Sequence, residues 1–349
     1  MKAAVFHGPG DVRIESVPEP GAPGPGELLI RVSKAALCGT DSAEWDHGPL
    51  LARPPVVLGH EFTGTVIAAG PQVPGIQAAG FPPGTRVVSG AGISCGSCEW
   101  CAAGRTNLCA CYQTLGLHLD GGLAELVLSP ASICRPVPDG LDDASAVMAQ
   151  PLAVAMHAAR RGRVGPGRSC AVIGTGGIGA FIVAAAAALG ASPLIAIDIA
   201  DGRLATAADL GATRTVNAGR DDAAGVVAAA TGEQGAHVVI EASGAPGSPA
   251  AALAMVRRGG DVVIVGLQPH PAGLDLFSVS TREVDVHGTL AHVCGEDLAE
   301  AVAVLASTPL ATTVRGGIIS LDDLVEDGLR PLAERKAHGK IVVDVAGSV

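Results

Sequence analysis

Short apolar runs separated by turn residues occupy the first 140 residues of the chain. Ala3–Phe6, Val12–Val17 and Leu28–Val32 have the length of strands, and the Pro/Gly-rich stretch 18–26 cannot continue the elements on either side of it. Many short strands divided by turns are typical of a barrel-like β domain. The pattern therefore predicts a β-rich N-terminal part.

Between residues 170 and 198 the pattern changes to strand, glycine turn, helix and strand. Gly174, Gly176 and Gly179 form a G-x-G-x-x-G turn, and the second strand ends on Asp198. The first glycine permits the bend, the second lets the backbone approach a pyrophosphate, and the third lets helix and strand pack closely. The helix N-terminus adds N–H groups for the negative charge. This stretch predicts dinucleotide binding.

Asp198 indicates which dinucleotide is expected. An acid at this place accepts hydrogen bonds from the adenosine ribose hydroxyls and repels a 2′-phosphate, so NAD is favoured over NADP. Arg203, five residues later, can partly offset that repulsion. The expected cofactor-binding residues are Gly174, Thr175, Gly176, Gly177, Ile178, Gly179, Asp198, Arg203, Ser243, Gly244, Gly266, Leu267 and Leu290.

Helical and strand-like segments alternate from residue 201 to residue 288. Helical segments are expected near 201–210 and 221–230, and apolar runs occur at 237–240, 262–265 and 284–286. Alternation of this kind predicts a parallel, doubly wound sheet whose ligands bind beyond the carboxyl ends of the strands. Ser243, Gly244, Gly266 and Leu267 follow strand ends, although as simple turn residues they would need no ligand. Leu290 and His292 are expected to border nicotinamide and substrate.

The C-terminal part is expected to return to the β-rich domain. A helix is predicted at 298–306, and residues 340–345 alternate like a terminal strand. The predicted domains are therefore 1–152 plus 289–349 for catalysis and 153–288 for NAD binding.

Composition narrows the class of partner. The chain has 349 residues and a net charge of −11, which argues against nucleic acid or an anionic membrane. No signal peptide is visible, and the apolar run 180–189 is too short to span a bilayer. The nine cysteines are then expected to be thiols or metal ligands in the cytoplasm.

Two short motifs carry candidate chemistry in the β-rich part. Cys38-Gly39-Thr40-Asp41 is followed by Gly59-His60-Glu61. Thiolate, imidazole and carboxylate are ligands of zinc, and a catalytic zinc takes three protein ligands and leaves one position open. Asp41 is expected to orient the His60 imidazole, or else to cap a helix or turn. Alone, Cys38 or His60 would be an ordinary core or surface residue; together they form a candidate reaction centre.

A third motif has the spacing C-x2-C-x2-C-x7-C. Four thiolates at this spacing satisfy a tetrahedral zinc with no open position, so the site is expected to be structural. An iron–sulfur cluster is the competing interpretation. The motif consists of Cys95, Cys98, Cys101 and Cys109, with Cys111, Cys134, Cys170 and Cys294 outside it.

Taken together, these motifs resemble the zinc-dependent medium-chain dehydrogenases of the alcohol dehydrogenase superfamily. Within it they are similar to the branch of sorbitol, threonine and 2,3-butanediol dehydrogenases. Further residues that carry the resemblance are Pro25-Gly26-Glu27, Asp120 to Glu125, Pro151 to Val154 and His157-Ala158. It implies a Rossmann domain beside a barrel-like, GroES-like catalytic domain.

The resemblance also implies the chemistry. Cys38, His60 and Glu61 would hold the catalytic zinc, and Thr40 would take the proton of the substrate hydroxyl while hydride passes to NAD. The expected reaction interconverts a secondary alcohol, such as a small diol or polyol, and its ketone. A homodimer or homotetramer is expected from the family.

Two positions depart from the pattern of these relatives. They usually carry Glu where this chain has Gln150, and a neutral amide is a poorer zinc ligand than a carboxylate. They commonly carry His where this chain has Ala43, so a proton relay would lack its last member unless His47 replaces it; a solvent-exposed or packing role for His47 is the alternative.

These departures leave two rival functions. One is a zinc-independent reductase of C=C or C=N bonds on the same fold, and the other is a non-catalytic nucleotide-binding protein. Chelation distinguishes the first, and NADH binding without turnover distinguishes the second. Retention of Cys38, His60, Glu61 and Thr40 together argues against a decayed site.

Overall fold

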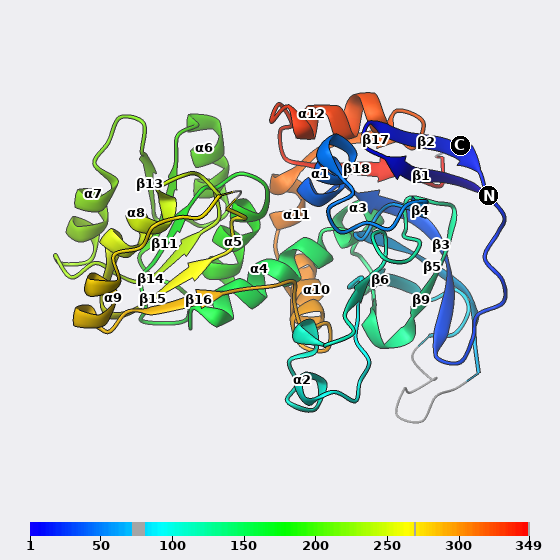
Figure 1. Ribbon diagram of the computed structural model, residues 1–349, viewed down its shortest axis with the longest axis horizontal. Coiled ribbons are helices and arrows are strands. Elements are labelled where there is room, and N and C mark those ends of the chain that lie inside the picture. The colour runs from blue at the N-terminus through cyan, green and yellow to red at the C-terminus, as the bar shows by residue number, and fades with distance from the viewer. Residues whose placement is uncertain (72–80, 269, 348–349) are drawn as a thin grey trace. The chain divides into compact units, whose positions relative to one another are not determined.

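The computed structural model describes residues 1–71, 81–268 and 270–347. The chain divides into two compact units (Figure 1). Unit 1 consists of Met1–Ala153 and Val293–Val349, and unit 2 consists of Val154–His292. Helix α4, Ala149–Arg161, runs through the boundary. Among the described residues, no helix has the length and apolar character needed to cross a membrane.

Unit 1 is built on β-sheets. A three-stranded sheet has the order β2 (Asp11–Ser16), β1 (Lys2–Gly8), β4 (Val56–Val57). A larger sheet runs β10 (Cys134–Pro136), β6 (Arg86–Ser89), β5 (Phe62–Ala69), β3 (Glu27–Ala36), β18 (Lys340–Asp344), β17 (Arg315–Ser320), with β9 (Leu126–Pro130) also paired to β3. A two-stranded antiparallel sheet is formed by β7 (Gly92–Ile93) and β8 (Gln113–Thr114).

Strand β3 shows why this unit is β-rich. Leu28, Ile30 and Val32 alternate along it and are almost fully buried in the core of the unit, while Arg31 between them is exposed. This period of two is the signature of a strand with one face on a core. The helices of the unit are short, apart from α1 and α10. They are α1 (Gly39–His47), α2 (Glu99–Ala102), α3 (Asp143–Ala146), α10 (Asp297–Ser307), α11 (Leu310–Val314) and α12 (Arg330–Ala333).

Unit 2 is a six-stranded parallel sheet. Its strand order is β13 (Arg214–Asn217), β12 (Leu194–Asp198), β11 (Cys170–Ile173), β14 (Ala236–Glu241), β15 (Val256–Ile264), β16 (Asp285–Gly288). The connecting helices are α5 (Gly177–Ala188), α6 (Asp201–Asp209), α7 (Ala223–Ala230), α8 (Ser248–Met255) and α9 (Leu276–Arg282). This is the 3-2-1-4-5-6 order of the Rossmann fold. The predicted fold class is confirmed.

The order explains where a ligand belongs. Strands β12 and β14 flank β11 in the sheet, so the chain direction of the crossovers reverses at β11. Strand β12 is buried at every position and β11 at every position but its last, as expected of strands covered on both faces. The glycine turn and the loops after β14 and β15 therefore share the carboxyl edge of the sheet.

Strands β13 and β17 were not predicted from the sequence. Strand β13 carries Arg214 and Thr215 exposed at its start, and β17 begins with Arg-Gly-Gly, so neither presents a continuous apolar run. Both lie at edges of their sheets, where only part of a strand is covered.

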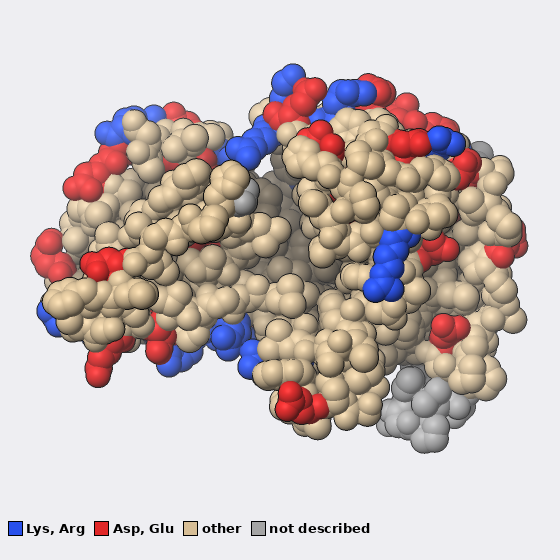
Figure 2. All heavy atoms as spheres, viewed as in Figure 1, with Lys and Arg blue, Asp and Glu red and all other residues tan. Residues whose placement is uncertain are grey.

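Charged side chains form small groups on the surface. On the face shown in Figure 2 acidic and basic residues are interspersed, and broad areas of both units are uncharged.

Candidate functional site

The first site is organised by the start of helix α1. Cys38 is the N-cap residue, with extended backbone angles. Its backbone N–H donates to Oδ2 of Asp41, 2.8 Å away, so Asp41 caps the helix from inside its first turn. Thr40 lies in the same turn, and its Oγ1 is 3.6 Å from the Cys38 Sγ. The CGTD motif thus fixes a thiol and a hydroxyl side by side.

His60 and Glu61 reach the site from the segment before strand β5. Gly59 precedes them with φ of +99°, and a Cβ there would lie 2.6 Å from the Leu123 backbone nitrogen. Only glycine tolerates both the left-handed conformation and this close approach. The motif DGGLAE around Leu123 is therefore needed to hold Gly59, and with it His60, in place.

Cys38, His60 and Glu61 converge. One ligand atom from each lies within 4.8 Å of the others, and His60 and Glu61 are buried. Sulfur, nitrogen and oxygen donors this close fit a zinc ion. The Nδ1 of His60 is 3.4 Å from Oδ1 of Asp41, which leaves Nε2 for a metal. Asp41 thus caps the helix, which is one of the two alternatives weighed for it, and its other carboxylate oxygen lies beside the imidazole; its role in orienting that ring stays a prediction.

The electrostatics favour a thiolate. Burial raises the pKa of the Cys38 thiol, but the charge and hydrogen bond of His60 and the charge of Lys340 together outweigh burial, so the net pKa lies below its ordinary value. Burial lowers the pKa of His60, yet the charges of Asp41 and Cys38 raise it well above its ordinary value overall. Zinc binds the thiolate form of cysteine and the neutral form of histidine, so metal binding would also release a proton from His60.

Lys340 is a member of this site that sequence reasoning missed. Its Nζ lies 2.6 Å from Glu61, although the two residues are 279 positions apart, and its side chain is 11% exposed. Burial lowers the pKa of Lys340, but Glu61 and Cys38 raise it overall, so the ammonium keeps its charge. The signal available in the sequence was a lysine directly before the apolar run Ile341–Val343 of the terminal strand.

The other residues considered for this site differ in their placement. Gln150 is buried at the second position of α4, 8% exposed, and its role as a ligand stays a prediction. His47 is 70% exposed at its side chain and pairs with Asp46 at 3.2 Å, which is the solvent-exposed alternative weighed above.

The four-cysteine motif forms a second group. One ligand atom from each of Cys95, Cys98, Cys101 and Cys109 lies within 4.8 Å of the rest. Backbone N–H groups of Cys95 and Cys111 donate to the Cys109 sulfur at 3.2 and 3.3 Å. Backbone hydrogen bonds from Ser97 and Cys98 lower the pKa of Cys95 to about 6. Four thiols with sulfur-directed N–H groups and no remaining position fit a structural zinc.

The cysteines outside this motif are expected to differ in reactivity. Burial raises the pKa of Cys134 to about 11 and that of Cys170 and Cys294 to about 12, whereas Cys111 is exposed. At pH 8 the thiolate fraction of the three buried thiols is about a thousandth or less. Among Cys111, Cys134, Cys170 and Cys294, timed iodoacetamide labelling read by mass spectrometry should modify Cys111 first. Equal labelling of Cys170 in the folded protein would contradict the assignment.

The glycine turn of unit 2 has the contacts that its sequence requires. Gly174 has φ of +84°, and a Cβ there would lie 2.6 Å from the Ser243 Cβ. Any side chain at Gly179 would collide with the Gly174 carbonyl oxygen. Above Gly176 lies the Arg203 guanidinium, 3.1 Å from the place of a Cβ. The turn is therefore packed against the loop after β14 and faces a cation.

Asp198 ends β12 and is nearly buried, 7% exposed. Its Oδ2 accepts from the Thr175 N–H at 2.8 Å, and its Oδ1 accepts from the Ile199 and Ala200 N–H groups at 2.8 and 3.0 Å. Arg203 Nη1 is 3.7 Å from Oδ1. The acid is thus locked beside the turn, with the predicted guanidinium next to it.

The remaining predicted cofactor residues lie at the same edge. A Cβ on Gly244 would be 2.7 Å from the Leu267 carbonyl oxygen, so the loops after β14 and β15 touch. Leu267 and Leu290 are 90% and 55% exposed. These assignments stay predictions.

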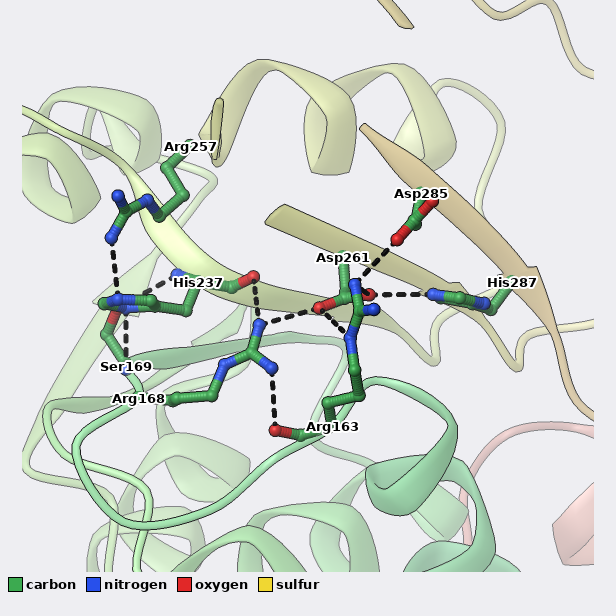
Figure 3. A network of polar contacts seen from close by, with 8 residues as sticks. All are labelled: Arg163, Arg168, Ser169, His237, Arg257, Asp261, Asp285 and His287. Atoms are coloured by element: carbon green, nitrogen blue, oxygen red, sulfur yellow. Dashed lines mark hydrogen bonds and ion pairs between the residues drawn. The ribbon is translucent and has the colours of Figure 1, made fainter. Parts of the chain in front are cut away.

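A third cluster of acids and histidine serves another purpose. Asp261, Asp285 and His287 lie close enough to bind a metal. However, Asp261 accepts hydrogen bonds from Arg163, Arg168 and His287, and Arg163 also pairs with Asp285 (Figure 3). Two guanidinium groups occupy the space that a cation would need, so we assign this cluster to the packing of the sheet's amino edge.

Comparisons with known families agree with this geometry. Residues 24–139 match the alcohol dehydrogenase GroES-like domain, and residues 177–307 match the zinc-binding dehydrogenase domain. The chain belongs to the zinc-binding alcohol dehydrogenases, which are oxidoreductases. The family resemblance inferred from the motifs is confirmed.

Individual relatives show which members of this family the chain resembles. Sorbitol dehydrogenase of Bacillus subtilis is 35% identical over 293 residues, which cover 82% of this chain and 81% of that protein. The crystal structure of 2R,3R-butanediol dehydrogenase from Bacillus subtilis is 28% identical with a TM-score of 0.88, covering 98% and 99% of the two chains. A putative zinc-binding dehydrogenase from Sinorhizobium meliloti 1021, bound to NADP, is 31% identical with a TM-score of 0.87, covering 98% of each chain.

Proposed function

We propose that this chain is an NAD-dependent zinc dehydrogenase that interconverts a small secondary diol or polyol and its ketone. The observation that carries the proposal is the convergence of Cys38, which is half-buried, with the buried His60 and Glu61 on one point of unit 1. The glycine turn and Asp198 in unit 2 support the dinucleotide. The names of the relatives, sorbitol and butanediol dehydrogenases, support the substrate class.

In this proposal residues 1–152 and 289–349 form the catalytic domain, and residues 153–288 bind NAD. Cys38, His60 and Glu61 would hold the catalytic zinc, and Cys95, Cys98, Cys101 and Cys109 the structural one. A bound zinc supplies a Lewis acid that favours the alkoxide of the substrate near neutral pH, and NAD supplies the hydride acceptor.

The chain's own residues have separate tasks around that chemistry. Thr40 lies beside the Cys38 sulfur, where its hydroxyl would receive the proton of the substrate hydroxyl and pass its own proton on towards solvent. Asp41 keeps the His60 imidazole in one tautomer and orientation. Lys340 neutralises Glu61, which limits how strongly this carboxylate competes with substrate for a metal.

A panel of alcohols tests the substrate class. Purified protein with NAD should reduce the cofactor with sorbitol, butane-2,3-diol or a related polyol, and do so more efficiently than with primary or aromatic alcohols. Chelation should abolish turnover, and added zinc should restore it. Activity that survives chelation would favour the zinc-independent reductase instead, and NADH binding without turnover on any alcohol or ketone would favour a non-catalytic protein.

We also propose a homodimer or homotetramer in the cytoplasm. Strand β16 lies at an edge of its sheet with Val286 exposed, and Leu276 and Phe277 nearby in sequence are 69% and 78% exposed. A second copy would cover these apolar side chains. None of the nine cysteines, all within the described residues, forms a disulfide, which supports a reducing compartment. Light scattering should give at least a dimer mass, and Phe277→Asp should reduce that mass while Leu267→Asp should not.

A further inference from the structure

Glu241 is a buried carboxylate at the carboxyl end of β14, and it belongs neither to the glycine fingerprint nor to the metal motifs. The residue is 0% exposed. Burying a charged group is costly unless hydrogen bonds satisfy it. The partners of Glu241 therefore show what holds the carboxylate there.

One carboxylate oxygen of Glu241 accepts hydrogen bonds from the loop after β14. Oε1 accepts from the Ser243 N–H at 2.7 Å, the Ser243 hydroxyl at 2.6 Å and the Gly244 N–H at 3.0 Å. The Ser248 hydroxyl, at the start of α8, lies 2.9 Å from the same oxygen. Hydrogen bonds to a charged acceptor are the strong ones, so this loop has little freedom to move.

The second carboxylate oxygen and the backbone carbonyl of Glu241 hold the loop after β15. Its Oε2 is 3.3 Å from the Gln268 side-chain nitrogen, and its backbone carbonyl accepts from Val265 and Gly266 N–H groups at 2.8 and 3.0 Å. A Cβ on Gly266 would lie 2.6 Å from Oε2. One residue thus ties together two loops at the carboxyl edge of the sheet.

The first of these loops supports the pyrophosphate turn. Gly174, the first glycine of the fingerprint, packs on Ser243, with 2.6 Å between the place of its Cβ and the Ser243 Cβ. Ser243 is in turn fixed by two hydrogen bonds from its N–H and hydroxyl to Glu241. Any drift of Ser243 would therefore move the wall against which the turn is packed.

We propose that Glu241 is a positioning residue for the dinucleotide. It acts through Ser243, Gly244 and Gly266, which it holds in the arrangement that receives the cofactor, and it does not need to touch the cofactor itself. The assignment rests on the proposed function, because it supposes that NAD binds at this edge. Preorganised loops lose less freedom on binding, so the expected signature is cofactor affinity.

The sheet offers a matched control. Asp261 on the neighbouring strand β15 is also a fully buried carboxylate with several donors, namely Arg163, Arg168 and His287 (Figure 3). Its two arginine partners lie in the segment before β11, at the amino edge of the sheet and away from the cofactor edge. Removing either carboxylate should lower thermal stability, but only Glu241 should affect the dinucleotide.

The experiment measures the Kd for NADH by fluorescence titration, alongside the melting temperature, in the full-length protein. Glu241→Ala should weaken NADH binding about tenfold or more, because several charged hydrogen bonds are lost. Glu241→Gln keeps one acceptor oxygen facing Ser243 but loses the charge that strengthens these hydrogen bonds, so it should weaken NADH binding by only about threefold. Asp261→Ala should lower the melting temperature while leaving the Kd within about twofold.

Each result decides the question. An unchanged Kd in Glu241→Ala would overturn the assignment, and so would an equal loss of affinity in Asp261→Ala, since both would reduce Glu241 to a general stabilising residue. If Glu241→Ala fails to fold, the test rests on Glu241→Gln. A Kd for NADH about threefold higher than that of wild type supports the assignment, and an unaltered Kd overturns it. Absence of NADH binding by wild type would overturn the proposed function as well, which separates the two failures.

Discussion

Cys38→Ser should lower kcat/KM for the alcohol by about a thousandfold or more, because a metal's stabilisation of the developing alkoxide is worth several kcal/mol. The serine hydroxyl is a far weaker zinc ligand than the thiolate that His60 favours at this position. The zinc content should fall from about two to about one per chain, since the four-cysteine site is untouched. Steady-state kinetics and elemental analysis measure the two effects.

A buried thiol elsewhere controls for general damage. Cys170→Ala removes a cysteine that is fully buried at the start of β11 and belongs to neither metal group. It should retain about two zinc ions per chain and near-normal turnover. If Cys38→Ser keeps both its zinc and its activity, the catalytic site has been wrongly placed.

Asp198→Asn should shift the ratio of kcat/KM for NAD over NADP towards NADP by about a hundredfold. Asparagine keeps the shape of the side chain and an acceptor for the Thr175 or Ile199 N–H group, but loses the charge that repels a 2′-phosphate. Arg203, 3.7 Å from Asp198, is then free to pair with that phosphate. The measurement is kcat/KM for both cofactors at saturating alcohol.

The double variant Asp198→Asn, Arg203→Ala separates the two contributions. If the guanidinium attracts the phosphate, the gain for NADP should shrink by about tenfold relative to the single variant. A wild-type preference for NADP, or an Asp198→Asn protein that prefers NAD as strongly as before, would contradict the role of Asp198.

The sequence was most informative where chemistry is carried by short motifs. The CGTD motif places Cys38, Thr40 and Asp41 in one helical turn. The four cysteines lie close together because one short loop carries them all. The glycine fingerprint was equally informative, because each glycine is required by a different close contact. In the structure a Cβ at Gly174 would collide with Ser243, and a Cβ at Gly179 with the Gly174 carbonyl oxygen.

Residues joined through tertiary structure could not be predicted in this way. Lys340 meets Glu61 only because β18 pairs with β3, and no local pattern encodes that pairing. Glu241 closes an apolar strand as any terminal acid would, and its importance appears only when two loops converge on it. Edge strands such as β13 were missed because a strand covered on one side needs no apolar run.

Zinc content per chain of the purified protein tests the central claim most directly. The account predicts about two zinc ions, one at Cys38, His60 and Glu61 and one at the four cysteines, with loss of turnover when the catalytic ion is chelated. A value of about one, with activity intact, would contradict it, because the chemistry would then proceed without the metal that this site is built to hold.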